Sequence, residues 1–387
     1  MCPRSVSEET PVPTAPAAGN ARVELPVPPV LCPFPFSYDE EAARRADEGI
    51  LAWAGSLGLP PERRTELAGH RIGTFAAMTH PDAADDDHLS LAARNMYAMF
   101  VADDHYCDEG PAGASSTLCP ARLGRTLTAL EGPRLSDSAA AEELVGPDLA
   151  TRALREVARH MTRLGTPAQA GRLRHETSAT FLAMAGESSW RLARHLPGPR
   201  EYLAHRQYNG ALSCLALIDV TGGYELPARD WENPAVRSLT LTASLLIILV
   251  NDLYSVAKES ADIGSQSLPT LLSAHHGWPL DRSMRITGEL HDHLMCHYLR
   301  REAQLTADTA NTADVSPEQP RYLRGLRNWM RGSLQWHAST GRHHRRAGRP
   351  TPATDSQGPA HDRLRTALRL RPPPGLCPHC RDGRSAP

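Results

Sequence analysis

The chain has 387 residues, with 42 basic and 44 acidic side chains and a formal net charge of −2. This near-neutral balance gives no reason to expect a nucleic-acid partner. The eight cysteines lack the spacing of a disulfide framework, and no signal peptide is apparent, which is typical of a cytoplasmic protein. Residues 239–250 are apolar but too short and too interrupted by Thr and Ser to span a bilayer, so we expect no membrane partner.

The two ends of the chain differ from its middle. Residues 1–34 are rich in proline and poor in large apolar side chains, and residues 346–387 are rich in arginine and proline, so we predict a disordered tail at each end. We therefore expect removal of residues 1–31 to leave catalysis nearly unchanged. Cys377 and Cys380 have the spacing of half a zinc site, but no second pair follows, and two thiols in a flexible tail are the alternative.

Residues 35–345 predict a single all-α domain. They are rich in Ala, Leu and Arg and nearly lack the alternating β-branched residues of strands, and their periodic segments have the lengths of helices. About 300 residues are enough to bury a sizeable core, and no second core is apparent. We therefore predict one helical bundle around an apolar interior.

A first group of carboxylates ends a predicted helix. Asp103 ends an apolar stripe with a helical period, formed by Leu89, Ala92, Met96 and Met99. Asp104 and Asp108 follow, one helical turn apart. Residues 103–109 hold four carboxylates, which repel one another unless solvent or cations neutralise them. A solvated helix end is one interpretation, and a metal site is the other.

A further helix is predicted to start near Pro199 and to carry Arg206. Most arginines in such a chain lie on the surface with buried stems, so an ordinary surface position is the default interpretation. Gly210 in the middle of a helix costs about 1 kcal/mol relative to alanine. Its presence predicts a helix break or a close approach of another element at this point.

A second group of polar residues follows the apolar residues 241–250. Asn251, Ser255 and Glu259 are four residues apart and therefore share one helix face. Their oxygens are hard ligands of the kind that Mg²⁺ prefers. A helix that emerges into solvent would explain one such triad. Two oxygen-ligand groups, each at the end of an apolar helix, instead predict the opposite walls of one metal–diphosphate site.

These motifs resemble those of bacterial class I terpene synthases. The sequence DDHYCDE at residues 103–109 resembles their aspartate-rich motif, and NDLYSVAKE at residues 251–259 resembles their NSE triad. Looser likeness at residues 51–54, 80–82 and 201–227 favours the 2-methylisoborneol synthase branch. The resemblance covers about residues 32 to 345.

The resemblance implies a set of site residues. Three Mg²⁺ ions would be held by Asp103, Asp104, Asp108, Asn251, Ser255 and Glu259. Diphosphate would be bound by Arg206, Lys258 and Arg342, with Arg206 as sensor, Asn209 as linker and Gly210 as effector. Lys258 is the single lysine of the chain.

Two features of these motifs differ from the usual pattern of the family. The linker Asn209 is more often an aspartate in relatives. His343 replaces the tyrosine of the usual Arg-Tyr pair after Arg342. The literal pair Arg321-Tyr322 comes too early in the chain to take that place. For both Arg321 and Arg342, an ordinary surface charge is the alternative interpretation.

The resemblance also implies a reaction. The substrate would be 2-methylgeranyl diphosphate, supplied by a SAM-dependent geranyl diphosphate 2-C-methyltransferase, and the product 2-methylisoborneol. Phe100, Tyr208 and Trp336 would line the cavity and stabilise carbocations, although ordinary core packing is the default interpretation of any single ring. The N-terminal tail would suit docking to a protein shell, and the resemblance leaves a homodimer open.

Several alternatives share this pattern. Proton loss in place of water capture would give 2-methylenebornane, and a deeper pocket would make the chain a sesquiterpene cyclase that uses farnesyl diphosphate. Chain-elongating prenyltransferases carry two aspartate-rich motifs, and the NSE triad argues against them. A non-enzymatic alternative is an inactive isoprenoid-binding or scaffold protein, which the intact ligand residues argue against.

Overall fold

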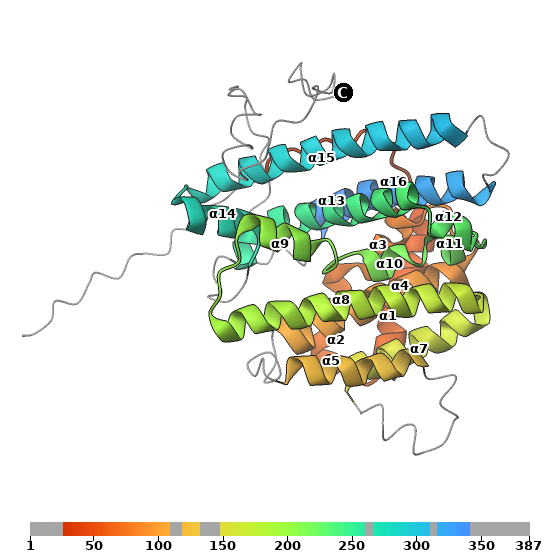
Figure 1. The fold of residues 1–387 in the computed structure, drawn as a ribbon. Coiled ribbons are helices and arrows are strands. Elements are labelled where there is room, and N and C mark those ends of the chain that lie inside the picture. The colour runs from red at the N-terminus through yellow and green to blue at the C-terminus, as the bar shows by residue number, and fades with distance from the viewer. Residues whose placement is uncertain (1–25, 109–117, 132–147, 260–265, 310–315, 341–387) are drawn as a thin grey trace, which may run out of the picture.

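The computed structural model describes residues 26–108, 118–131, 148–259, 266–309 and 316–340. Within these ranges all regular structure is helical, which confirms the predicted all-α class (Figure 1). The elements in chain order are α1 (Glu40–Ser56), α2 (Pro61–His70), α3 (Ile72–Thr79), α4 (Asp86–Asp103), η1 (Asp104–Asp108), α5 (Cys119–Leu127), η2 (Thr128–Glu131), α7 (Leu149–Leu164), α8 (Pro167–Ala193), α9 (Pro199–Arg206), α10 (Leu212–Leu215), α11 (Ile218–Thr221), α12 (Ala228–Trp231), α13 (Pro234–Glu259), α14 (Leu268–His276), α15 (Leu280–Thr309) and α16 (Glu318–Ser339).

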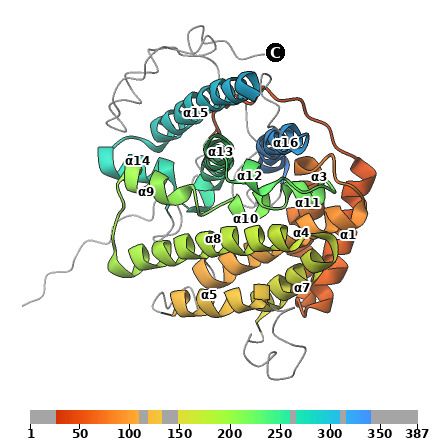
Figure 2. The same ribbon diagram turned by 45° about the vertical axis from the view of Figure 1, so that its right-hand side comes forward.

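Helix α13 lies inside the bundle. Figure 2 shows it with α15 on one side, α8 on the other and α16 beside it, and it packs directly against α14, α15 and α16. The apolar part of this helix is longer than the sequence alone indicates: residues Pro234–Val256 are long and apolar enough to cross a membrane by length and composition. However, 72% of its most apolar window is buried inside the bundle, as expected for a core helix.

Local sequence signals fix where the two long helices next to the site begin. The Asp85 carboxylate accepts hydrogen bonds from the backbone N–H groups of Asp87 and His88, both at 2.9 Å, and so caps the start of α4. At the start of α8, Thr166 and Gln169 form a reciprocal capping box. These caps set the register with which α4 and α8 present their inner faces.

Two glycines allow α3 to lie unusually close to its neighbours. A Cβ atom on Gly73 would overlap the backbone of Asp47 in α1, and one on Gly332 of α16 would overlap the backbone carbonyl of Met78 in α3. All eight residues of α3 are buried. The short helix therefore packs closely between α1 and α16, and this position brings Phe75 to the interior.

Residues 26–34, which we call the N-terminal strap, pack on the domain. Val27 and Val30 contact a cluster formed by Leu253, Val256 and Met284. The backbone N–H of Leu31 donates to Asp292 Oδ1 at 2.6 Å. The predicted boundary at residue 34 is therefore corrected, because the strap belongs to the folded part. Residues 1–25 and 341–387, with the predicted C-terminal tail and its cysteines, lie outside the described residues.

Candidate active site

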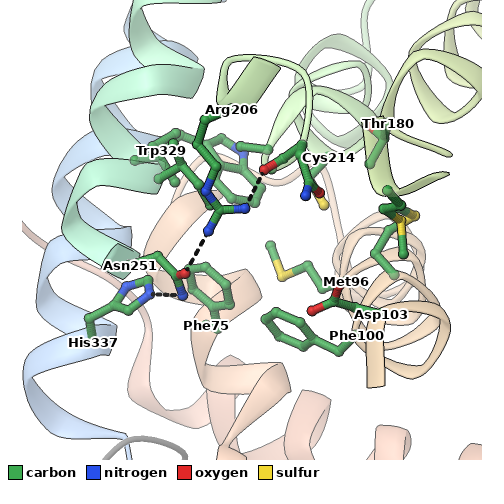
Figure 3. Close-up of a pocket in the computed structure, with 17 residues that line it drawn as sticks. Phe75, Met96, Phe100, Asp103, Thr180, Arg206, Cys214, Asn251, Trp329 and His337 are labelled. Carbon is green, nitrogen blue, oxygen red and sulfur yellow. Dashed lines mark hydrogen bonds between the residues drawn. The ribbon is translucent and has the colours of Figure 1, made fainter. Parts of the chain in front are cut away.

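A cavity opens between α3, α4, α8, α13, α16 and the connection from α9 to α10 (Figure 3). Its wall is largely apolar or aromatic, with Phe75, Met96, Met99, Phe100, Met184, Ala211, Cys214, Ile247, Ile248 and Trp329. The polar side chains that line it are Asp103, Thr180, Arg206, Asn209, Asn251 and His337. An apolar chamber with a few placed polar groups is the usual form of a small-molecule site.

The two predicted oxygen-ligand groups meet at this cavity. Asp103, the last residue of α4, and Asn251, in the final turns of α13, lie on opposite sides of it (Figure 3). They are separated by 148 positions in the chain, and only the packing of α4 and α13 in one bundle brings them to a common space. Each offers an oxygen donor to a ligand between them.

Asp104 differs from the sequence-based expectation. Successive helical residues point about 100° apart, so the carboxylate after Asp103 leaves the first cavity. Asp104 instead lines a second cavity, together with Arg63, Tyr97 and His105. The prediction that Asp104 shares a metal site with Asp103 is therefore not supported by its position. Phe100 lines both cavities and separates them.

The rest of the predicted ligand set is described only in part. Ser255 is buried on α13, one turn after Asn251. The side chains of Asp108, Lys258 and Glu259 lie outside the described residues, as do Arg342 and His343 entirely. Among the described residues, no group of three or more His, Cys, Asp or Glu side chains could hold a metal ion.

The chain breaks helical structure between Arg206 and Leu212, as Gly210 predicts. Helix α9 ends at Arg206 and α10 begins at Leu212. A Cβ atom on Gly210 would lie 3.1 Å from Cδ1 and 3.2 Å from Cγ1 of Ile248, which is tighter than ordinary contact. Both the break and the close approach thus occur, and they expose Asn209 and Gly210 to the cavity.

Arg206 is not an ordinary surface arginine, because its side chain is only 12% exposed. Its Nη1 donates to the backbone carbonyl of Asn209 at 2.8 Å, and its Nη2 donates to Asn251 Oδ1 at 3.3 Å. The guanidinium therefore connects the helix break to the polar face of α13. It lies at the cavity wall, where a negatively charged ligand group would meet it (Figure 3).

Asp252 holds Arg206 in place and was missed by sequence reasoning. Its side chain is fully buried, and its Oδ1 accepts from Arg206 Nη2 at 3.0 Å and Nε at 3.2 Å. Its Oδ2 accepts from the Tyr202 hydroxyl at 2.9 Å and the Leu268 backbone N–H at 3.0 Å. One signal was available: a carboxylate in a helix this apolar needs a cationic partner when buried.

Aromatic rings form a stack along one wall. Phe75 lies parallel to Trp336, with centroids 4.2 Å apart and an interplanar angle of 11°, and Phe100 lies 5.9 Å from Trp336 at 15°. Phe75 and Phe100 line the cavity, whereas Trp336 lies behind them and donates from Nε1 to the His70 carbonyl at 2.9 Å. The expected cavity position of Trp336 is therefore corrected to a supporting one.

Tyr208 was expected to line the cavity, but Trp329, which was not among the predicted cavity residues, lines it instead. Tyr208 is half-buried in the connection after α9, packs against the main core and is not among the residues that line this cavity. Trp329 of α16 does line the cavity, and its Nε1 donates to His80 Nε2 at 3.1 Å. Burial lowers the pKa of His80 to about 3, so its ring is neutral and can accept this bond.

Cys214 is the one thiol among the residues that line the cavity. Its burial raises the pKa of the thiol to about 12, although a hydrogen bond from Asn95 acts in the opposite direction. The group is therefore a neutral thiol near pH 7. Since the thiolate is the nucleophilic form of cysteine, Cys214 presents a weakly reactive surface to a cation in the cavity.

A protein-family model matches the part of the chain that holds both predicted metal motifs. The model described as terpene synthase family 2, C-terminal metal binding, matches residues 94–296, a range that contains both Asp103 and the triad beginning at Asn251. The chain belongs to the terpene synthase family. It is a terpene cyclase, a lyase that acts on a prenyl diphosphate.

Curated relatives of this terpene synthase resemble it over most of its length. It is 30% identical to 2-methylisoborneol synthase from Saccharopolyspora erythraea over 87% of this chain and 98% of that protein. It is also 30% identical to spiroviolene synthase from Streptomyces violens, over 81% of this chain and 84% of that protein. The relatives therefore include synthases with different products.

A solved structure supports the same fold for this terpene synthase. The crystal structure of 2-methylisoborneol synthase from Streptomyces coelicolor, in complex with Mg²⁺ and geranyl-S-thiolodiphosphate, aligns with a TM-score of 0.72 and 28% identity. The alignment covers 83% of this chain and 98% of that one. The helical architecture is therefore that of class I terpene synthases.

Proposed function

We propose that this terpene synthase cyclises 2-methylgeranyl diphosphate to 2-methylisoborneol with release of diphosphate. The observation that carries this proposal is the similarity to 2-methylisoborneol synthase along 87% of the chain. The apolar cavity with Asp103 and Asn251 on opposite sides supports it, since the substrate has an apolar chain and an anionic head. The same proposal includes a methyltransferase that acts upstream on geranyl diphosphate.

The cofactor in this proposal is Mg²⁺, for which the donor chemistry is suitable. The Asp103 carboxylate, the Asn251 amide oxygen and the Ser255 hydroxyl are hard oxygen donors, and two of the three line the cavity. When bound, Mg²⁺ neutralises the diphosphate and makes it a better leaving group. A set of three ions, completed by Asp108 and Glu259, remains part of the proposal.

Arg206 has the position to bind and orient the diphosphate. Its guanidinium lies at the cavity wall, and the buried Asp252 and the Asn209 carbonyl hold it there. A guanidinium can donate several charge-assisted hydrogen bonds to phosphate oxygens in a fixed geometry. In the proposal Lys258 and Arg342 add further positive charge around the diphosphate. Asn209 then acts as the linker and Gly210 as the effector that respond when Arg206 binds the departing diphosphate.

The rest of the cavity protects the cation that remains when the carbon–oxygen bond breaks. The faces of Phe75, Phe100 and Trp329 supply negative π density, and the neutral Cys214 thiol does not trap the cation. Ring closure gives a bornyl-like cation, and one water adds to it and loses a proton to form the alcohol. The products are thus 2-methylisoborneol and diphosphate, with one water consumed.

The test is product analysis by gas chromatography, with geranyl, 2-methylgeranyl and farnesyl diphosphates offered in parallel. One buried methyl is worth about 0.8 kcal/mol and up to about 3 kcal/mol with a good fit, so we expect a preference of about 4-fold to 150-fold for the methylated substrate over geranyl diphosphate. Excess EDTA or the Asn251→Ala substitution should abolish turnover without loss of helical circular dichroism.

Other outcomes would revise the proposal in defined ways. Efficient conversion of farnesyl diphosphate would make the chain a sesquiterpene cyclase, an activity that the 27% identical 4-epi-cubebol synthase of Streptosporangium roseum has by name. An alkene product would indicate 2-methylenebornane and proton loss. Docking of the N-terminal region to a protein shell, and a homodimer, are separate proposals for pull-down and light-scattering experiments.

A further inference from the structure

His337 on α16 faces the proposed metal ligand Asn251 across the cavity edge (Figure 3). The ring is buried, only 3% exposed, and packs edge-on against Trp336, with centroids 4.9 Å apart. Asn251 Nδ2 and His337 Nε2 lie 3.2 Å apart. A buried imidazole in contact with a side-chain amide raises the question of which atom donates.

The other ring nitrogen decides the tautomer. His337 Nδ1 lies 2.8 Å from the backbone carbonyl of Ser333 and 3.3 Å from its hydroxyl. A carbonyl oxygen can only accept, so the shorter contact requires Nδ1 to carry the proton. Nε2 faces the Asn251 amide nitrogen, which can only donate, so Nε2 is the acceptor of this pair. It accepts a hydrogen bond from the Asn251 NH₂ group.

The two neighbours of Asn251 together select one orientation of its amide. Arg206 Nη2, which can only donate, lies 3.3 Å from Asn251 Oδ1. If the amide were flipped, its NH₂ group would lie next to the Arg206 donor, and its oxygen would lie next to the lone pair of His337 Nε2. Both contacts would then be repulsive. The amide oxygen is therefore directed away from His337, toward Arg206 and the cavity.

We infer that His337 is a positioning residue that orients the Asn251 amide oxygen toward the proposed metal. The inference rests on the proposed Mg²⁺ site. His337 would act through Asn251 without contacting the ion, in the way that residues behind metal ligands fix ligand orientation. The contact with Asn251 also joins the C-terminal part of α16 to the polar face of α13, while the Ser333 carbonyl holds the His337 ring within α16.

A matched pair of variants separates orientation from packing. In His337→Gln the side-chain oxygen can reach the place of Nε2 and still accept from Asn251. In His337→Asn the shorter amide can keep the contact with the Ser333 carbonyl but cannot reach Asn251. Both variants remove the ring and remain polar, so they lose the same aromatic packing. The difference between them reports the Asn251 contact.

The experiment measures how Mg²⁺ raises the melting temperature of the full chain in the presence of inorganic pyrophosphate, and therefore does not depend on turnover. We expect the half-saturating Mg²⁺ concentration of His337→Asn to rise about 10-fold to 100-fold, with His337→Gln remaining near the unmodified protein. In turnover assays of His337→Asn, the Mg²⁺ concentration needed for half-maximal activity should change more than the KM for the prenyl diphosphate measured at saturating Mg²⁺.

Two results would overturn this inference and leave the proposed function standing. One is a His337→Asn variant with the Mg²⁺ dependence of the unmodified protein, and the other is an equal loss in both variants, which would indicate packing. If the unmodified protein showed no Mg²⁺-dependent stabilisation, the metal site of the proposed function would fail together with the inference. The three outcomes are therefore distinguishable.

Discussion

Arg206 and Asp252 form a charge pair in which neither member is well solvated. The Asp252 side chain is completely buried and that of Arg206 is 12% exposed, and their atoms approach to 3.0 Å. Such a pair adds little stability by comparison with an apolar pair, but the loss of one member leaves an uncompensated buried charge. Asp252 therefore matters more for holding Arg206 at the cavity than for stability as such.

We predict that Asp252→Asn lowers the free energy of unfolding by about 3–5 kcal/mol. The loss in the free energy of unfolding should be about 3 kcal/mol, because the Glu187 carboxylate lies 3.9 Å from Arg206 and partly compensates its charge. Turnover should fall as well, because Arg206 loses its anchor. Urea unfolding followed by circular dichroism measures the change.

The control for this prediction is Asp281→Asn. Asp281 pairs with Arg285 at 3.9 Å, but both side chains are about half exposed or more. An exposed pair contributes about 0–1 kcal/mol, so the control should remain close to the unmodified protein. Equal stability of the two variants would contradict the role given to Asp252.

Helix α3 has an influence on the site that its eight residues do not suggest. It carries Phe75, whose ring lines the cavity and stacks on Trp336 of α16. The close packing of α3 against α16 depends on Gly332, because any side chain there would meet the Met78 backbone. The position of the aromatic wall is thus set by contact between two helix backbones.

We predict opposite effects for two glycine-to-alanine substitutions. Gly332→Ala should lower stability by about 1–3 kcal/mol or more, because the backbone of Met78 cannot move aside as a side chain would. Gly49→Ala, in the exposed middle of α1 with no atom within 4 Å of the new Cβ, should raise stability by up to about 1 kcal/mol. Thermal unfolding of both variants checks the signs, and a stable Gly332→Ala protein would refute the close packing.

The N-terminal strap connects the start of the described chain to the end of the metal-motif helix. Val27 and Val30 pack against Leu253 and Val256, which belong to the same part of α13 as Asn251 and Ser255. The backbone bond from Leu31 to Asp292 fixes the strap to α15. The bundle is therefore closed by a segment that its proline content would assign to a loose tail.

We predict that removal of residues 1–34 lowers the stability of the domain relative to removal of residues 1–25. The half-buried Val27, Val30, Leu31 and Phe34 lose their contacts, which we expect to cost about 2–4 kcal/mol in total. Differential scanning calorimetry should show a melting temperature lower by several degrees for the shorter protein. Identical melting curves would show that the strap contributes nothing to the fold.

Helix periodicity and motif spacing are local properties, and for that reason they could be predicted from the sequence. The stripe that ends at Asp103, the shared face of Asn251 and Ser255, and the break at Gly210 each depend on residues within a few turns of one another. The all-α class follows from the same patterns summed along the chain. The family resemblance added an expected reaction, which the comparisons support at the level of a terpene cyclase.

Only the tertiary structure decided which side chains meet. Helical geometry turns Asp104 about 100° away from Asp103, and only the packing of α4 shows that Asp103 is the one that lines the first cavity. Trp336 lies behind Phe75 and Phe100, whereas Trp329 of the same helix lines the cavity. For Asp252 the sequence indicates that a cationic partner is needed but not which residue supplies it, and His337 and the N-terminal strap have no distinctive pattern in the sequence. Their roles come from contacts across 46, 86 and more than 200 positions, and local propensity carries no information about such distances along the chain.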